Sequence, residues 1–263
     1  MPALSDIGRI DSLRVVILVD NRRVSSEVLS TWGLSIYIDT GVAKILFDTD
    51  SSWNILKYNA EVLGVPLEDL DFIFISHWHG DHSGGLSGLI SHVKRFGRNV
   101  EVVVPSKPLF GGEFFIVARR PVKLCDGVVT TGVLGWFVRE HSLIVNVDGC
   151  GPVVFVGCAH PGIPSILRRA ADVTGSTTIY GVVGGYHIDA EEANRVADVL
   201  ERFNVRIVAP CHCISNSAIN VLSELLGERS VRTFTGKCIL IGNDFHEPSS
   251  TSNIDAGGCY IRF

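Results

Sequence analysis

Short apolar runs bounded by glycine, proline, asparagine or aspartate recur along the chain, alternating with longer segments whose apolar residues repeat every three or four positions. The short runs predict β-strands, and their nearly unbroken apolar character is typical of strands buried on both faces. The periodic segments predict helices with one apolar face. Strands are expected at residues 13–19, 34–38, 43–47, 72–75, 100–104, 136–138, 143–147, 153–156, 178–183, 205–209, 231–234 and 238–241, with short β-segments within 105–135.

Helices are expected from this periodicity and from residues typical of helix ends. Asp189 and Glu192, three residues apart, have the spacing of a capping box. We find no internal repeat and no linker, so residues 1–263 are predicted to form one domain, β-rich in its first half and alternating α/β in its second. The polar tail at 247–258 is expected to be mobile and 260–263 to dock. The predicted helices cover about 52–63, 86–96, 164–173, 190–203 and 215–226.

Composition agrees with a well-packed globular protein. The 263 residues are 46% hydrophobic and 19% charged, which is too apolar for a disordered chain. The formal net charge of −5 argues against a nucleic-acid-binding surface, which usually has a basic excess. Basic pairs such as Arg22-Arg23 and Arg168-Arg169 could meet an anionic substrate, although solvated surface charge is the simpler explanation for each pair.

Three features of the sequence bear on the cellular compartment. No segment resembles a signal peptide, and apolar runs such as 153–156 are far too short to span a bilayer. The seven cysteines are scattered and odd in number, which does not indicate a disulfide framework. The cytoplasm is therefore the expected compartment, with no membrane partner, and the oligomeric state stays open.

The densest group of reactive side chains follows the strand predicted at 72–75. Residues 76–82 read Ser-His-Trp-His-Gly-Asp-His, so three imidazoles and one carboxylate fall within six positions. Neutral imidazole and carboxylate bind zinc, and also iron or manganese. In an extended turn His77 and His79 can close on one ion, while Asp81 and His82 project toward a second. Solvated loop histidines or a single core histidine are the alternatives, and the density of the group favours a metal site.

Three more histidines follow predicted strands. His160, His187 and His212 each stand beside glycine or proline, or close to them, where a strand ends. Loops on a rigid scaffold of strands place functional groups, so four histidine-bearing strand ends indicate one shared pocket. His187 is as well suited to face a substrate as to bind a metal. Asp48 closes the strand predicted at 43–47 and is expected to neighbour the histidines.

Seven short motifs occur along the chain in this order: Trp32-Gly33-Leu34-Ser35, Leu46-Phe47-Asp48-Thr49, Asn59-Ala60, Ser76 to Leu86, Gly157 to Ile163, Gly184 to His187, and Pro210 to Cys213. They resemble the metallo-β-lactamase-fold superfamily, whose H-x-H-x-D-H signature matches residues 77–82. They further resemble the subgroup named for a methanopterin-pathway synthase, which joins a dihydropterin diphosphate to a ribofuranosyl-aminobenzene phosphate. Asp50 stands where that subgroup commonly has glycine, which leaves the substrate open.

The resemblance implies an α+β protein with the αββα sandwich of the metallo-β-lactamase type. It implies two divalent metal ions, zinc in the first place, with iron or manganese as alternatives. Carried over residue by residue, it gives His77, His79 and His160 to one ion and Asp81, His82 and His212 to the other.

The resemblance also implies supporting residues. Asp48 would hydrogen-bond a ligand histidine and fix its tautomer. Cys158 stands where many relatives supply a ligand between or beside the ions, and a small buried hydrophobic residue is the other interpretation. Cys211 and Cys213, which flank His212, are interpreted as structural.

Six ligands are thus assigned without His187. We therefore expect His187 within reach of the ions but facing the substrate as a hydrogen-bond donor or proton carrier, and we count Asp81 with it as catalytic. The implied function is a dinuclear metal-dependent enzyme acting on a phosphorylated or diphosphate-bearing small molecule. The alternatives are a metal-dependent hydrolase of phosphodiesterase, lactonase or thioesterase type, or a non-catalytic metal-binding protein.

Overall fold

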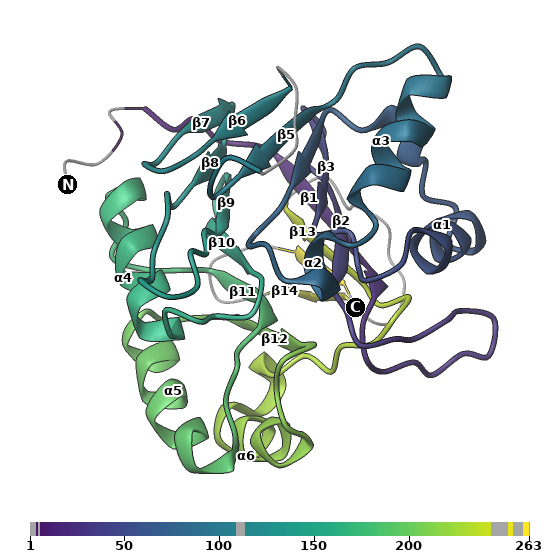
Figure 1. Ribbon diagram of the computed structural model, residues 1–263. Coiled ribbons are helices and arrows are strands. Elements are labelled where there is room, and N and C mark those ends of the chain that lie inside the picture. The colour runs from purple at the N-terminus through teal and green to yellow at the C-terminus, as the bar shows by residue number, and fades with distance from the viewer. Residues whose placement is uncertain (1–3, 5, 109–113, 243–251, 255–259, 263) are drawn as a thin grey trace.

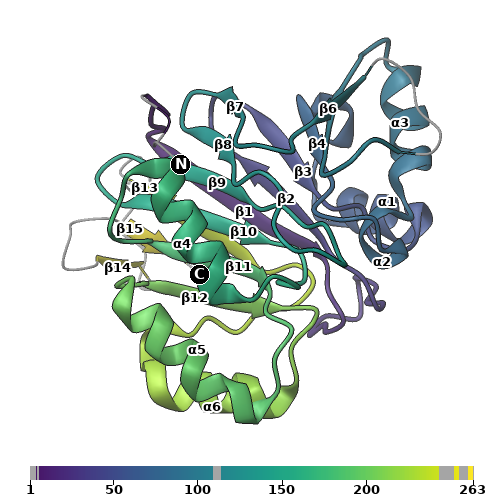
Figure 2. The same ribbon diagram turned by 60° about the vertical axis from the view of Figure 1, so that its left-hand side comes forward.

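Two β-sheets pack face to face, and helices cover both outer faces (Figure 1, Figure 2). The computed structural model describes residues 4, 6–108, 114–242, 252–254 and 260–262. Within these residues the αββα sandwich expected from the sequence is confirmed.

The first sheet is built from β1 (Ser12–Val19), β2 (Ser35–Asp39), β3 (Lys44–Phe47), β4 (Phe72–Phe74), β5 (Glu101–Val104), β6 (Phe115–Val117), β13 (Cys238–Gly242), β14 (Ser252–Ile254) and β15 (Tyr260–Arg262). The spatial order of these described strands is β14-β15-β13-β1-β2-β3-β4-β5-β6. Strands β3 to β6 are parallel to one another, and the others pair antiparallel.

The second sheet is built from β7 (Lys123–Cys125), β8 (Val128–Thr130), β9 (Leu143–Val147), β10 (Gly151–Val156), β11 (Gly181–Gly185) and β12 (Ile207–Cys211). Its order is β12-β11-β10-β9-β8-β7. Strands β10, β11 and β12 are parallel neighbours, so each connection between them must cross over, and each does so through a helix.

Helices form the two outer layers. The helices α1 (Trp53–Val62), α2 (Gly80–Ser83) and α3 (Leu86–Arg95) lie on the side of the first sheet, and α4 (Ile163–Thr174), α5 (Ala190–Arg202) and α6 (Asn216–Leu226) cover the second (Figure 1). Short 3₁₀ turns occur at Leu67–Asp69 and Gly227–Arg229. Helices α5 and α6 begin at side-chain caps, because Asp189 accepts the N–H of Glu191 and Ser215 that of Ala218.

Alternation along β1 divides the core into layers. Leu13, Val15 and Ile17 lie between the two sheets, whereas Val16 and Leu18 belong to the layer beneath α1 and α3. Because neighbouring strand residues face opposite sides, one unbroken apolar run contributes to two cores. Truncating such a side chain to alanine typically costs about 2–5 kcal/mol. A third apolar layer joins the second sheet to α4, α5 and α6.

Two predicted strands are wrong. Residues 136–138 form a loop in which Trp136 and Phe137 are 96% and 104% exposed, and 231–234 is not a strand. Each run has strand-like composition, but a strand also needs a partner backbone, and neither run joins a ladder within the described residues. The strand expected at 178–183 begins later, at Gly181.

The C-terminal segment adds strands to the first sheet. Tyr260–Arg262 pairs with β13 and with β14, as expected for docking of residues 260–263. Residues 252–254, expected to be mobile, form β14, and the rest of the tail at 247–258 lies outside the described residues.

The cysteines are not all alike. Among the described residues, five cysteines are free and Cys150 is disulfide-bonded, which the scattered spacing of the cysteines gave no reason to expect. Among the described residues, no helix has the length and apolarity needed to cross a membrane. The free cysteines are Cys125, Cys158, Cys211, Cys213 and Cys238.

Candidate metal centre

The loop after β4 carries imidazoles close together. His77 is buried, and its Nε2 lies 3.0 Å from Nδ1 of His79, the residue that precedes α2. The rings of His77 and His82 are 4.2 Å apart between centroids. The single turn of α2 directs His82 into the core and leaves Asp81 partly exposed. The loop thus gathers the four side chains nominated from the sequence, and their binding of metal stays a prediction.

His160, in the loop after β10, joins the first pair. Its ring centroid lies 5.0 Å from that of His77 and 4.9 Å from that of His79. Its Nε2 is buried and has no hydrogen-bond partner among the described residues. Burying an unpartnered polar nitrogen is unfavourable unless something binds it. A divalent ion between these imidazoles would use that nitrogen, so the residues present fit a metal.

His212, in the loop after β12, joins the second pair. Its Nε2 lies 3.2 Å from Nε2 of His82 and 3.2 Å from Oδ2 of Asp81. His212 and His82 are fully buried. The six candidate ligands therefore lie in one cluster, with His160 beside His77 and His79 and with His212 beside His82 and Asp81, and their division between two ions stays a prediction.

Asp48 lies beneath the loop at the end of β3 and is fully buried. Its carboxylate accepts the N–H and the O–H of Ser76, each at 2.7 Å, and lies 2.6 Å from Nδ1 of His82. Nδ1 of His82 therefore donates to Asp48, which leaves Nε2 directed at the cluster. The hydroxyl of Ser76 is also 2.9 Å from Nδ1 of His77. Asp48 thus contacts a candidate ligand histidine, as expected from the sequence.

Glu140 is a supporting residue that the sequence analysis missed. It is buried and accepts the backbone N–H groups of Cys158, Ala159 and His160 at 2.8 to 3.0 Å. Burial raises the pKa of Glu140, and these three donors oppose that rise. Glu140 holds the loop after β10 in place, yet no motif surrounds it in the sequence.

Asp20 and Asn21, which the sequence analysis also missed, hold His212 in place. Asp20 accepts the backbone N–H of His212 at 2.6 Å, and Oδ1 of Asn21 lies 2.9 Å from its Nδ1. Both residues follow β1, far from His212 in the sequence. Burial raises the pKa of Asp20.

Strained backbone gathers around the cluster. Among the described residues, six non-glycine residues have positive φ, a conformation that side chains other than glycine rarely adopt. Such strain persists where the surrounding structure enforces it, which is often at functional sites. Five of the six lie in or beside the candidate centre: Asp48, Asp50, Ala159, His187 and His212.

Cys158 and Cys213 bring two thiols to the same place. Sγ of buried Cys158 lies 3.1 Å from Nε2 of His82 and 2.9 Å from Sγ of half-buried Cys213. The hydrogen bond between the thiols lowers the pKa of Cys213 and raises that of Cys158. Cys211 packs in the core between the sheets, as a structural residue does, whereas Cys213 reaches the centre.

Burial and crowding set the protonation of the imidazoles. Burial, together with neighbouring imidazoles, lowers the pKa of His160 to about 4 and that of His77 far below its usual value. Burial also lowers the pKa of His82, but the Asp48 carboxylate outweighs it and raises the value to about 10. His77 and His160 are therefore neutral near pH 7, which is the form that binds metals.

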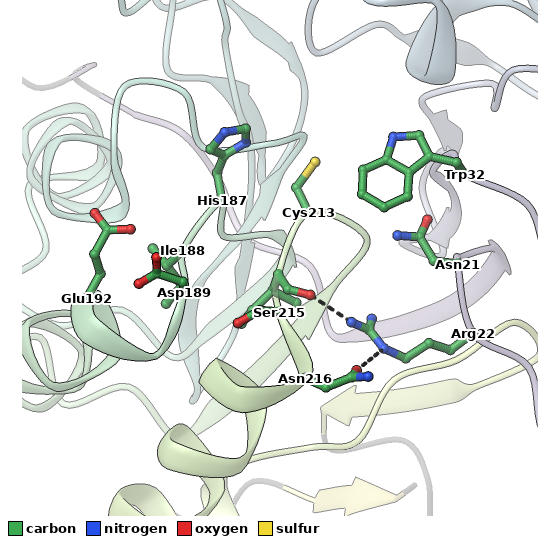
Figure 3. Close-up of a pocket in the computed structure, with 11 residues that line it drawn as sticks. Asn21, Arg22, Trp32, His187, Ile188, Asp189, Glu192, Cys213, Ser215 and Asn216 are labelled. Atoms are coloured by element: carbon green, nitrogen blue, oxygen red, sulfur yellow. Dashed lines mark hydrogen bonds between the residues drawn. The ribbon is translucent and has the colours of Figure 1, made fainter.

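A pocket of about 710 Å³ opens beside the cluster (Figure 3). Trp32 stands on one side and His187 on the other, with Cys213 between them. The ring of His187 lies 4.8 Å from that of His160, and the ring of Trp32 lies 5.2 Å from that of His212. His187 therefore lies within reach of the candidate centre and borders the pocket.

Comparisons with known proteins agree with this geometry. The model of the metallo-beta-lactamase superfamily matches residues 33–94, which include the histidine loop. The chain is 27% identical to a 7,8-dihydropterin-6-methyl-4-(beta-D-ribofuranosyl)-aminobenzene-5'-phosphate synthase from Methanocaldococcus jannaschii. That match covers 90% of this chain and 99% of the synthase.

Solved structures show the same fold. A metal-dependent hydrolase of the beta-lactamase superfamily is 24% identical and matches with a TM-score of 0.70, over 86% of this chain and 98% of its own. The metallo-beta-lactamase fold protein YhfI from Bacillus subtilis is 13% identical, with a TM-score of 0.63, over 87% and 99%. The chain therefore has the metallo-β-lactamase fold, matches the superfamily model over its histidine loop, and is similar over most of its length to the dihydropterin-(ribofuranosyl)aminobenzene-phosphate synthase.

Proposed function

We propose that this protein is a dinuclear metal-dependent enzyme acting on a phosphorylated or diphosphate-bearing small molecule, as the synthase that it resembles does. One observation carries the proposal. Side chains from the ends of β4, β10 and β12 meet in two adjacent groups of three. Imidazole and carboxylate ligands in this number suit two ions that each keep an open or shared position, and they suit zinc well.

Two such ions would lower the pKa of a bound water and polarise a phosphoryl oxygen. The residues around them orient the ligands. Asp48 keeps the proton of His82 on Nδ1, and Ser76 links Asp48 to Nδ1 of His77. The side chains of Glu140 and Asp20 hold the loops after β10 and β12, because they accept the backbone N–H groups of His160 and His212. The centre is therefore pre-organised by buried carboxylates on other segments.

The protein's own charged side chains around the pocket offer little attraction for an anion, so an anionic substrate would bind through the ions. Arg22 donates to the carbonyl of Ile214 at 2.8 Å and to Asn216 at 3.3 Å, and its Nη1 lies 3.6 Å from Asp20 (Figure 3). Nε and Nη2 of Arg22 are thus engaged by the protein, Nη1 is buried beside Asp20, and the other charged residues that line the pocket, Asp189 and Glu192, are acidic. Metal ions would then be the main positive charge facing a phosphate.

Trp32 supports a substrate with a planar ring. It is 64% exposed, although large apolar side chains are usually buried, and it forms a wall of the pocket. An aromatic face next to polar groups is typical of sites that bind small ring compounds. Both substrates implied by the resemblance carry such a ring.

His187 is proposed as a proton carrier. It lines the pocket two residues after the end of β11, where its exposed imidazole can reach a bound substrate. A proton donor in this position would serve a phosphate or another leaving group. The metal-dependent hydrolase remains the second candidate, because the same two groups of ligands would also serve hydrolysis.

Metal content and turnover test the proposal. Protein purified without chelator should contain about two equivalents of zinc per chain. Supplied with a dihydropterin diphosphate and a ribofuranosyl-aminobenzene phosphate, it should release diphosphate and form the coupled product. Less than about half an equivalent of transition metal after supplementation would contradict the metal centre. Turnover of a generic phosphodiester without coupling would favour the hydrolase.

A further inference from the structure

Three neighbouring strand ends bring a thiol, an imidazole and a second thiol together. The register of the parallel strands β10, β11 and β12 aligns their carboxyl ends. Cys158, His187 and Cys213 follow these ends by two residues each. A Cβ at Gly185 would lie 2.2 Å from the carbonyl oxygen of Gly157, so glycine at 185 permits the close approach of the first two loops. The three side chains are therefore placed by the sheet.

The distances between these groups suit a metal ion. The two Sγ atoms and a ring nitrogen of His187 all lie within 4.8 Å of one another, and the sulfurs are 2.9 Å apart. The N–H of His187 donates to the carbonyl of Cys213 at 2.5 Å, which couples the two loops. A tetrahedral zinc ion with Zn–S bonds of about 2.3 Å holds two sulfurs about 3.7 Å apart. Rotation of the half-buried Cys213 can supply that difference.

We propose that Cys158, His187 and Cys213 form a third metal position, which takes a thiophilic divalent ion such as zinc or cadmium. Two thiolates and one imidazole select such ions over magnesium, calcium or manganese. The six residues of the dinuclear centre offer nitrogen and oxygen only, so the two kinds of position differ in preference. Binding at the third position displaces the thiol protons to solvent.

The site has support on one side and access on the other. The backbone N–H of Cys158 is held by Glu140, so the deepest ligand is fixed. His187 and Cys213 line the pocket, through which an ion can enter and where its fourth position stays open (Figure 3). The sulfur of Cys158 also lies near both groups of the dinuclear centre and can bridge to them.

An ion in the third position would inhibit turnover. It would occupy the nitrogen lone pair of His187 and remove the proton carrier, so turnover should fall about 10²-fold, the usual scale for a general acid–base group. This consequence rests on the proposed function, whereas metal binding at the position does not.

Counting metal ions tests the third position. Reduced protein loaded with two equivalents of zinc per chain is titrated with Cd²⁺. Total bound metal is measured after desalting, together with the ultraviolet sulfur-to-metal charge-transfer absorbance. We expect about one equivalent beyond the two of the dinuclear centre, with a rise in that absorbance. Cys213→Ser should lose the third equivalent of metal and the rise in absorbance, and it should keep the two equivalents of the dinuclear centre. The control Cys238→Ser removes another half-buried free thiol, on β13, and should keep the third equivalent.

Several results would overturn the third position. The parent protein could bind no third equivalent of metal. Alternatively, Cys213→Ser could still bind the third equivalent, or Cys238→Ser could lose it to the same extent as Cys213→Ser. Loss of one of the first two equivalents in Cys213→Ser would assign that thiol to the dinuclear centre instead. A parent that binds about one equivalent, with charge-transfer absorbance that Cys213→Ser abolishes, would keep the thiolate site and refute the dinuclear centre.

Discussion

The two sides of the candidate centre are built differently. On one side, His77, His79, Asp81 and His82 fall within six consecutive positions, so one loop and one helical turn set their spacing. On the other side, each residue comes from a separate strand end, and the register of a parallel sheet sets the spacing. The first side is local in sequence and the second exists only in the folded protein.

Both sides nevertheless use the same means of support. A buried carboxylate accepts backbone N–H groups of each ligand-bearing loop: Asp48 for Ser76, Glu140 for the loop after β10, and Asp20 for His212. Buried backbone N–H groups need an acceptor, so each of these carboxyl groups holds its loop in place. Substitutions in the candidate ligands of either side, or in the carboxylates that support them, should separate what each side contributes to metal binding and turnover.

The largest effect is expected from breaking the local side with Asp81→Ala. Asp81 is the carboxylate of the group formed with His82 and His212, and its Oδ2 lies 3.2 Å from Nε2 of His212. The variant should therefore bind less of the ion assigned to this group than of the other ion, and turnover should fall to background. Elemental analysis and the coupling assay measure both. His92→Ala is the control, because His92 lies on α3 and its ring packs against Trp53 of α1, away from the cluster. Equal activity of the two variants would place catalysis elsewhere.

His187→Ala tests the sheet-built side. We expect about 10²-fold lower turnover, the scale of a general acid–base group, with both ions of the dinuclear centre retained. Turnover and metal content are measured on the same preparation. If the variant lost one of those two ions, His187 would be a ligand of the dinuclear centre and not a proton carrier.

Asp48→Asn weakens the support of the local side. Asparagine tolerates the positive φ of 59° at this position better than other residues of its size, so the backbone should hold. Metal affinity should fall about 10–100-fold, the range for residues that orient a ligand histidine, as measured by competition with a chelator. Unchanged affinity would mean that the contact with His82 does not orient a ligand.

The same pair predicts a pH dependence in metal-free protein. Asp48 raises the pKa of His82 from 6.5 to about 10, so the folded state binds this proton more tightly than the unfolded state. The resulting stability is complete below pH 6.5 and is lost as the pH rises toward 10. Thermal unfolding followed from pH 7 to 10 should therefore show a falling Tm, and a smaller fall in Asp48→Asn. An equal fall in the Tm of the parent protein and of Asp48→Asn would show that the Asp48–His82 pair does not cause the pH dependence.

The smallest effect is expected from Glu140→Gln, in the support of the sheet-built side. One oxygen remains as an acceptor, so the loop keeps part of its hydrogen bonding. We expect about 10-fold weaker metal binding and about 1–3 kcal/mol lower free energy of unfolding, from chelator competition and denaturant titration. Loss of stability with metal affinity unchanged would limit Glu140 to a role in the fold.

The sequence by itself determined the layers and the local side. Apolar alternation along β1 already separates two cores, because strand geometry directs neighbouring side chains to opposite faces. The histidine loop could be recognised because its ligand-type residues are consecutive. The place of Asp48 followed from the motif that contains it. Each of these features depends on residues close together in the chain.

Only the tertiary structure decided the other side. Glu140 lies eighteen residues from Cys158 and Asp20 lies 192 from His212, and no local pattern connects either pair. Cys213 is interpreted from the sequence as structural because it flanks His212, whereas its place 2.9 Å from Cys158 depends on sheet register. Residues 136–138 have the composition of a strand, but only the fold decides whether another strand lies beside them, and they form an exposed loop. Composition reports the burial that a segment prefers, whereas the partner of a backbone amide or a side chain comes from whichever distant segment the fold brings beside it.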